Sequence, residues 1–244
     1  MITFLIPTAK EMKILTQSSH KPLTSKSSAI AHELAKLSTD ELARCYKLSL
    51  PAAEEEAKRW ALLVTNQAAN YPALHLFNGL MYRHIVREEL STDELAYLDE
   101  HIFITSALYG IIPVRESIAA HRLDFNTPFK IDGKSLKAFW RKEFDNFVTN
   151  NKVVAISLLS SEFEEVFSAS VRKNFVNVIF MEEKDGQLKK HSTISKKARG
   201  QFLTAAVKAS VETVTEIKSL TFGGFSYRPD LSTEKQLVFV KVVS

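Results

Sequence analysis

The stretch Val153-Val154-Ala155-Ile156-Ser157-Leu158 is the clearest sign of how this chain folds. It is a continuous apolar run of strand length, which predicts a buried strand. A second short run, Ile2-Thr3-Phe4-Leu5-Ile6, stands near the start of the chain and ends at Pro7. The sequence therefore predicts buried strands in parts of the chain that lie far apart.

Helical patterns surround these strands. Ser38 and Ser91 each begin a Ser-Thr-Asp-Glu sequence, which combines a capping residue with acids in the first helical turn. Residues 135–150 have amphipathic spacing. No Gly/Pro-rich linker divides the chain, so we expect one mixed α/β domain over residues 1–244, with a mixed central sheet flanked by helices.

The C-terminal third contains a hairpin signal and a long helical pattern. Strands are expected at 175–181 and 188–194, on either side of the turn Glu183-Lys184-Asp185-Gly186. A long helix is expected at 198–214, and further strands at 220–227 and 236–243.

Composition sets broad limits on function. The chain has 244 residues, 45% of them hydrophobic, and a formal net charge of +4. Its 28 acidic residues dilute the 32 basic ones, so an anionic partner is permitted but a histone-like protein is excluded. Cys45 is the only cysteine, which excludes an internal disulfide and suits a reducing cytoplasm. No apolar stretch approaches membrane-spanning length, so we expect a cytoplasmic protein without membrane association.

Motifs for common cofactors are missing from the sequence. There is no G-x-G-x-x-G and no P-loop pattern, and Gly223-Gly224 stands alone between strand-like runs. The histidines lack zinc-ligand spacing, and a single cysteine cannot build a CxxC site. We therefore expect neither a cofactor nor a metal site.

The sequence Ser195-Lys196-Lys197-Ala198-Arg199-Gly200 is the most informative feature for function. It places three cations within four residues, where a long helix is expected to begin. Cations are unfavourable at the positive end of a helix unless an anion binds there. An anion site and a solvated basic turn are the two interpretations.

Other cations stand beside predicted strand ends. Lys10 follows the first strand, and Arg122 lies in the cluster His121-Arg122-Leu123-Asp124. A solvated Lys10, and a structural pair of Arg122 with Asp124 or Glu162, are the alternatives to a ligand role. Because ligands of α/β proteins bind where strand ends and helix starts converge, we expect one basic cleft. Its expected cations are Lys10, Arg122, Lys196, Lys197 and Arg199.

Six short motifs follow one another along nearly the whole chain. They are Ala9-Lys10 after the first strand, Phe77-Asn78-Gly79-Leu80-Met81-Tyr82, Leu108-Tyr109-Gly110 through Arg122-Leu123, Phe139-Trp140, Leu159-Ser160-Ser161-Glu162-Phe163 and Lys196-Lys197-Ala198-Arg199-Gly200. In this order and spacing they resemble the bacterial peroxide stress protein YaaA family, whose K-K-A-R-G is present unchanged. The chain departs from the family pattern at Pro7-Thr8 in place of S-P, at 113–116 in place of R-P-L-D, and at His121 in place of a tyrosine.

The resemblance implies a mixed α/β domain with a positively charged cleft. It also implies sequence-independent DNA binding, including through a helix-hairpin-helix element, and a role in limiting free iron and oxidative DNA damage under peroxide. Leu108-Tyr109-Gly110 is the candidate hairpin, because a hairpin with glycine lets backbone N–H groups approach a phosphate. A plain turn is the alternative.

Two functions of different classes stay open. The first is a non-enzymatic, DNA-binding stress protein, which needs cations spread along an extended surface. The second is an enzyme that binds a phosphorylated or carboxylated small molecule, which needs the cations to converge with a carboxylate in a small pocket. Asp124 or Glu162 would then be the general base. Glu162 also fits a capping role at a helix N-terminus after Ser160.

Overall fold

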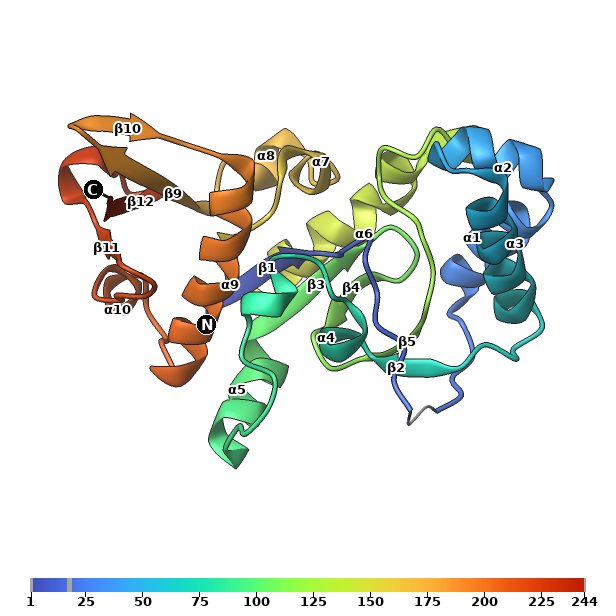
Figure 1. Ribbon diagram of the computed structural model, residues 1–244, viewed down its shortest axis with the longest axis horizontal. Helices are drawn as coiled ribbons and strands as arrows, with labels where there is room; N and C mark the ends of the chain where they lie inside the picture. Colours follow the sequence, from blue (N-terminus) through green and yellow to red (C-terminus); the bar gives the residue numbers. More distant parts are fainter. Residues whose placement is uncertain (1, 17–18, 244) are drawn as a thin grey trace.

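The structure is a computed structural model that describes residues 2–16 and 19–243. An eight-stranded sheet runs through the molecule (Figure 1). From edge to edge its strands are β11 (Phe225–Tyr227), β12 (Gln236–Val242), β9 (Val176–Lys184), β8 (Val154–Ser157), β1 (Ile2–Pro7), β3 (Ile102–Ser106) and β4 (Gly110–Pro113), with β10 (Gln187–Lys189) paired to β9.

The sheet is mixed, as the sequence predicted. β12, β9, β8, β1 and β3 run parallel to one another. β11, β10 and β4 pair antiparallel with their neighbours. The turn at 183–186 joins β9 to β10, which confirms the predicted hairpin, whereas the strand expected at 220–227 is confined to β11.

Helices cover both faces of the sheet, and two small sheets lie beside it: β2 (Asn70–Pro72) with β5 (Ser117–Ala119), and β6 (Lys130–Ile131) with β7 (Lys134–Ser135). The helices of the described residues are α1 (Ser25–Ala35), α2 (Thr39–Tyr46), α3 (Leu50–Val64), α4 (Ala73–Leu76), α5 (Thr92–His101), α6 (Leu136–Asn150), α7 (Ser161–Glu164), α8 (Ala169–Arg172), α9 (Ser192–Lys208) and α10 (Val214–Lys218), with 3-10 turns η1 (Tyr82–His84) and η2 (Pro229–Leu231).

β1 separates the two halves of the core. Phe4 and Ile6 pack with residues of α4, α5 and α9, whereas Leu5 faces the opposite side and packs with residues of α1, α3 and α6. All three side chains are fully buried. Successive side chains of a strand point to opposite faces, so a strand buried on both faces is mainly apolar; in β1 the buried Thr3 is the one polar side chain. The helices α1–α3 pack together at the end of the molecule away from β9 and β12 (Figure 1).

The long C-terminal helix begins earlier than the sequence predicted. α9 starts at Ser192, inside the strand expected at 188–194, and ends at Lys208. Ile194, Ala198 and Phe202 are four residues apart and all contact the core, so Ile194 belongs to a helical pattern. Lys196 is the fifth helical residue and lies beyond the four free amides of the N-terminus. The expectation that the three cations stand at the helix start is therefore wrong.

The segment Leu108-Tyr109-Gly110 is not part of a helix-hairpin-helix element. It turns the chain between the antiparallel strands β3 and β4. The N–H groups of Leu108 and Tyr109 donate to Ser106 Oγ at 3.2 and 3.1 Å, so they are already occupied. At Gly110 the φ angle is +78°, and an added Cβ would lie 2.8 Å from the Trp140 ring. The glycine thus serves a tight strand turn packed on α6.

The two Ser-Thr-Asp-Glu sequences form the capping boxes that the sequence predicted. Ser38 caps α2 and Ser91 caps α5, and each accepts a hydrogen bond from the backbone N–H of the glutamate three residues later. In return, Glu41 and Glu94 accept from the backbone N–H of their capping serine at 2.8 Å.

We expect S91A to lower the free energy of unfolding by about 1 kcal/mol, because the helix loses a hydrogen bond to a free N-terminal amide. Chemical denaturation of the purified variant measures this loss. T92A is the matched control, since exposed Thr92 makes no capping bond and its loss should cost less than about 0.5 kcal/mol. Equal losses in the two variants would contradict the capping role.

Candidate functional site

A pocket of about 500 Å³ lies just beyond the carboxyl ends of β1 and β8. The chain lines it at the end of β1 and just after, at residues 7–12, and after β8, at residues 160, 162 and 163. β3 and β8 flank β1 on opposite sides, so the strand order reverses between β1 and β8. Open α/β sheets bind ligands in the crevice outside the carboxyl ends of strands at such a reversal.

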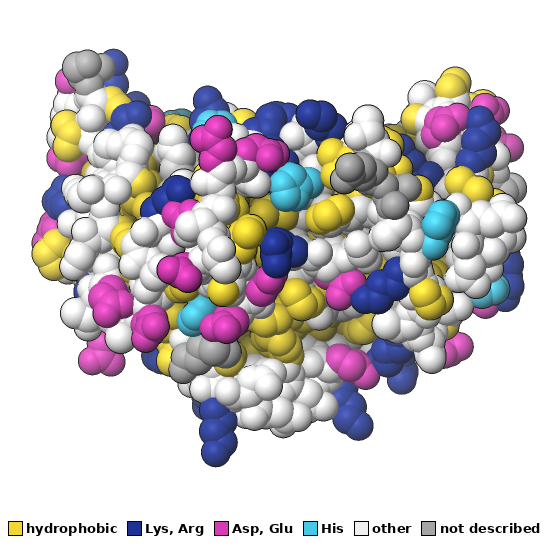
Figure 2. Space-filling view, turned by 90° about the horizontal axis from the view of Figure 1, so that it is seen from below, with side chains coloured by type: hydrophobic (Ala, Val, Ile, Leu, Met, Phe, Trp, Pro, Cys, Tyr) yellow, Lys and Arg dark blue, Asp and Glu magenta, His cyan; other side chains and the backbone are white. Residues whose placement is uncertain are grey.

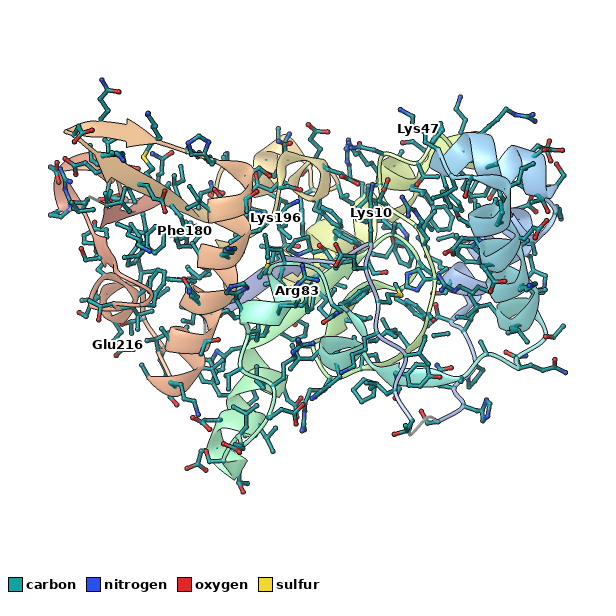
Figure 3. The ribbon with its side chains drawn as sticks, viewed as in Figure 1. Lys10, Lys47, Arg83, Phe180, Lys196 and Glu216 are labelled. Atoms are coloured by element: carbon teal, nitrogen blue, oxygen red, sulfur yellow. The ribbon has the colours of Figure 1, made fainter. Side chains whose placement is uncertain are left out.

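Three further segments complete the wall of the pocket. They are residues 79–83, residues 121–124 and one face of α9. Figure 3 shows Lys10 after β1, Arg83 in η1 and Lys196 on α9 near the middle of the molecule, whereas Lys47 lies at the C-terminal end of α2. The pocket therefore joins parts of the chain that are distant in sequence.

Close backbone packing at two glycines holds these segments together. A Cβ on Gly200 would lie 2.3 Å from the carbonyl oxygen of Met81, and a Cβ on Gly79 would lie 2.7 Å from Cβ of Ala9. Both distances are too short for a side chain. Gly200 lets α9 touch the segment around η1, and Gly79 lets the same segment touch the chain that leaves β1.

Hydrogen bonds fix the same contacts. Thr204 Oγ1 donates to His84 O at 3.1 Å and accepts from Val86 N at 2.9 Å, which ties α9 to the segment after η1. The Tyr82 hydroxyl, fully buried, donates to Pro7 O at 2.8 Å at the end of β1. The F-x-G-x-x-Y and K-K-A-R-G motifs therefore shape the pocket through Gly79, Tyr82 and Gly200.

Asp124 is held in the pocket as a charged carboxylate. Its Oδ2 lies 2.9 Å from Lys10 Nζ, and its Oδ1 accepts from Thr127 Oγ1 and Asn126 N, both at 3.1 Å. Burial alone would raise the pKa of Asp124, but the contacts with Lys10, Thr127 and Asn126 outweigh it and lower the pKa. Lys10 is thus an ion-pair partner of Asp124, in place of the Arg122 pair considered from the sequence.

Glu162 lines the pocket with fewer partners. Its Oε1 accepts from the backbone N–H of Asn126 at 3.3 Å. Burial, followed by the negative charge of Asp124, raises the pKa of Glu162, while Asn126, Lys10 and Lys137 act in the opposite direction. Glu162 does not cap α7: its bond goes to another segment, and Ser160 makes no side-chain capping bond. The helix α7 does place Glu162 in its first turn after the N-cap residue Ser160, as considered from the sequence, but the Glu162 carboxylate makes no capping hydrogen bond there.

The cations of the pocket fall into two groups. Lys10 pairs with Asp124, and Arg83 Nη1 lies 2.6 Å from Glu11 Oε2. Within residues 2–16 and 19–243, Arg122, Lys196 and Arg199 form no ion pair with a carboxylate, although all three line the pocket. Arg199 donates through Nη2 to Leu159 O at 3.0 Å, which orients its guanidinium at the end of β8.

The structure thus brings together most of the residues singled out from the sequence. Lys10, Arg122, Lys196, Arg199, Asp124 and Glu162 all line this pocket, whereas Lys197 does not. Thr193, Lys196 and Arg199 are three residues apart and share one face of α9, and Lys197 lies beside that face. With Glu11, Asp124 and Glu162 in its wall, the pocket carries charges of both signs. Whether these residues bind a ligand stays a prediction.

The segment 121–124 owes its position to a buried glutamate that sequence reasoning missed. Glu56 of α3 accepts from Arg122 N at 3.1 Å and pairs with Arg59 at 2.5 Å. Burial raises the pKa of Glu56, although Arg59 and Arg122 oppose this effect. Nothing in the helical pattern of α3 marked this glutamate, because its partner is a backbone amide on a distant loop.

His121, which replaces the family's tyrosine, is a neutral wall residue. It is 1% exposed, its Nδ1 lies 2.9 Å from Ala119 O, and burial lowers its pKa to about 4. It therefore adds no positive charge at neutral pH. Arg115, in the segment that replaces R-P-L-D, pairs with Asp99 outside the pocket.

Arg83 lines the pocket and was also missed by the sequence interpretation. It directly follows Tyr82 of the F-x-G-x-x-Y motif, and this position was the one signal in the sequence that could have marked it.

Within the described ranges, no group of three or more His, Cys, Asp or Glu side chains is placed to hold a metal ion. In the same ranges, no helix has the length and apolar character needed to cross a membrane.

Comparisons with known proteins agree with the motifs. A sequence model of the family described as "Peroxide stress protein YaaA" matches residues 2–231. A UPF0246 protein of Streptococcus thermophilus is 53% identical over 243 residues, which cover 100% of this chain and 99% of that protein. A UPF0246 protein of Streptococcus pyogenes is 50% identical over 241 residues, which cover 99% of each chain.

We expect G200A to destabilise the protein by about 1–3 kcal/mol, because the added methyl group collides with the Met81 carbonyl and forces α9 away from η1. Thermal unfolding measures the loss as a lowered Tm. K197A is the control, since Lys197 is an exposed residue of the same helix. An unchanged Tm for G200A would mean that the close backbone contact is not required.

Proposed function

This chain belongs to the peroxide stress protein YaaA family, and we propose that it binds a phosphorylated or carboxylated small molecule in the pocket beyond β1 and β8. The proposal rests mainly on Arg122, Lys196 and Arg199, which line one pocket without a carboxylate partner in the described part of the chain. Arg122 and Arg199 are partly buried, whereas Lys196 is exposed. An anionic ligand would stabilise the two partly buried cations, because charge-assisted hydrogen bonds strengthen where water is excluded.

Arg199 supports an anionic ligand most directly. Burial lowers the pKa of Arg199, and the charge of nearby Glu164 opposes that effect only in part. Its one hydrogen bond in the described structure uses Nη2, which leaves other donors of the guanidinium for a ligand. A bound phosphate or carboxylate would offset the cost of burying this charge.

The two carboxyl groups favour a catalytic site over a site that only binds an anion. Asp124 and Glu162 share the pocket with the cations. The pKa of Asp124 is lowered, so it stays ionised, whereas the pKa of Glu162 is raised, so it gains a proton more readily. Such a difference between neighbouring carboxyl groups is typical of acid–base catalysis. The cations would hold the anionic part of a substrate, and the carboxyl pair would act on the part beside it.

We expect K196A to weaken the binding of inorganic phosphate about five- to tenfold, because the pocket loses one charge-assisted contact. Isothermal titration calorimetry at low ionic strength measures the affinity. K197A removes the same charge from the next residue of α9, outside the pocket, and should change the affinity less than twofold. Equal effects of K196A and K197A would contradict binding inside the pocket.

DNA binding is the second candidate function, and exposed lysines in and beside the pocket favour it. The side chain of Lys10 is 61% exposed, and Lys196 and Lys197 are also exposed. These cations would contact phosphates of a DNA backbone without reading its sequence. On the face drawn in Figure 2, however, acidic and basic side chains are interspersed, whereas a duplex binder needs a basic band.

If DNA is the ligand, its affinity should fall roughly a thousandfold between 50 and 200 mM salt, because several counterions are released on binding. Fluorescence anisotropy with unrelated duplexes measures this loss and any preference among sequences. An extended interface predicts that K196A and K197A weaken DNA binding equally. A DNA affinity that does not change with salt concentration, or a strong preference for one DNA sequence, would contradict this second candidate.

The variants K196A and K197A also test whether ligand binding, to a small anion or to DNA, is needed for the peroxide response. We propose that the protein acts in the cytoplasm, where it helps to limit free iron and oxidative DNA damage. A deletion strain complemented with the wild-type protein, K196A or K197A can be exposed to hydrogen peroxide, with free iron and DNA lesions as readouts. Failure of K196A alone to protect the cells would tie the response to the pocket.

A further inference from the structure

Asp124 and Glu162 meet at a single hydrogen-bond donor. The backbone N–H of Asn126 lies 3.1 Å from Asp124 Oδ1 and 3.3 Å from Glu162 Oε1. The two carboxyl oxygens therefore cannot be further apart than the sum of these distances. Two carboxylates this close repel each other, so a proton is favoured on one of them.

The partners of the two groups decide which one takes the proton. Asp124 is held by an ammonium group, a hydroxyl and the backbone N–H of Asn126, all of which favour the charged form. Glu162 has only the shared N–H, and within the described residues it forms no ion pair. The proton is therefore expected on Glu162.

Other charges around Glu162 do not cancel this preference. Asp124 faces it from the 121–124 segment, Lys10 from the chain after β1, and Lys137 from α6. Lys10 and Lys137 are themselves engaged, by Asp124 at 2.9 Å and by Glu165 at 2.6 Å. The net direction for the pKa of Glu162 remains upward, with burial as the largest cause.

We propose that Glu162 is the proton donor of this pocket and hydrogen-bonds, as a carboxylic acid, to an oxygen of the bound anion. This inference rests on the proposed function, because it requires an anion at Arg122, Lys196 and Arg199. The anion adds negative charge beside Glu162, so binding draws a proton from solvent onto its carboxyl group. No covalent bond changes in this step, and the proton returns to solvent when the ligand leaves.

The affinity of the pocket for anions should then depend on pH. A neutral carboxylic acid donates a hydrogen bond to an anionic oxygen, whereas an ionised one repels it. Anion affinity should therefore fall as pH rises through the range in which Glu162 loses its proton. Asp124 stays ionised throughout and keeps Lys10 in place.

Sulfate is the probe for the test, because it remains a dianion across the working pH range and takes up no proton itself. Calorimetry in buffers of different ionisation enthalpy, between about pH 5 and 8, gives the number of protons taken up on binding. The wild-type protein should take up as much as about one proton per sulfate within this range. E162Q should bind sulfate with little proton uptake and with an affinity that varies much less with pH.

Two further variants keep the result specific to Glu162. E55Q removes an exposed glutamate on α3, outside the pocket, and should leave proton uptake unchanged. D124N keeps the shape of Asp124 but removes the negative charge that raises the pKa of Glu162. The pH at which proton uptake is half-maximal should therefore move downward. Thermal unfolding of each variant shows whether it is folded before binding is measured.

The outcomes separate this inference from the proposed function. If the wild-type protein does not bind sulfate, the proposed anion pocket is wrong, and this inference falls with it. Sulfate binding without proton uptake, or uptake that persists in E162Q, would overturn the role of Glu162 alone. Uptake that disappears in E162Q and persists in E55Q would support it.

Discussion

The backbone contact between Gly200 on α9 and Met81 beside η1 is the constraint on which the pocket depends. A side chain at residue 200 would collide with the Met81 carbonyl, so only glycine allows this approach. From there, Tyr82 reaches the end of β1 through its bond to Pro7. One close contact thus sets the relative positions of a helix, a turn and the central strand. It also fixes where Lys196 and Arg199 of α9 lie in the wall of the pocket.

The pocket also shows how burial gives identical chemical groups different properties. Asp124 and Glu162 are both carboxyl groups in one wall, yet the pKa of one is lowered and that of the other is raised. The difference comes from the ion pair and hydrogen bonds that Asp124 has and Glu162 lacks. The same holds for the cations, since Lys10 and Arg83 are neutralised by neighbours while Arg122, Lys196 and Arg199 face the pocket without such a partner in the described residues.

Local patterns in the sequence predicted much of the fold and part of the site. The buried strands β1 and β8, the helix α6 and the capped helices α2 and α5 carry their signals within a few residues. The meeting of Lys10, Arg122, Lys196 and Arg199 followed from their places beside strand ends and in one helix.

What the sequence failed to predict depends on tertiary packing. The apolar spacing that extends α9 back to Ser192 was ambiguous in isolation, because Ile194 fits a strand or a helix equally well. The glycine turn at 108–110 belongs to a β-hairpin because of the strands that flank it, not because of its own residues. The contact of Glu56 with Arg122 N joins two distant segments and leaves no local pattern.

The place of β1 in the middle of the sheet has a consequence for how the protein is made. Ile2 pairs with Val154, so the N-terminal strand leaves the ribosome long before one of its two neighbours exists. Pairing across such a separation in sequence is slow, and an apolar strand that waits unpaired is prone to aggregation. Because the pocket is built on β1 and β8, we expect it to be completed late in folding, when the chain has already passed its period of greatest risk.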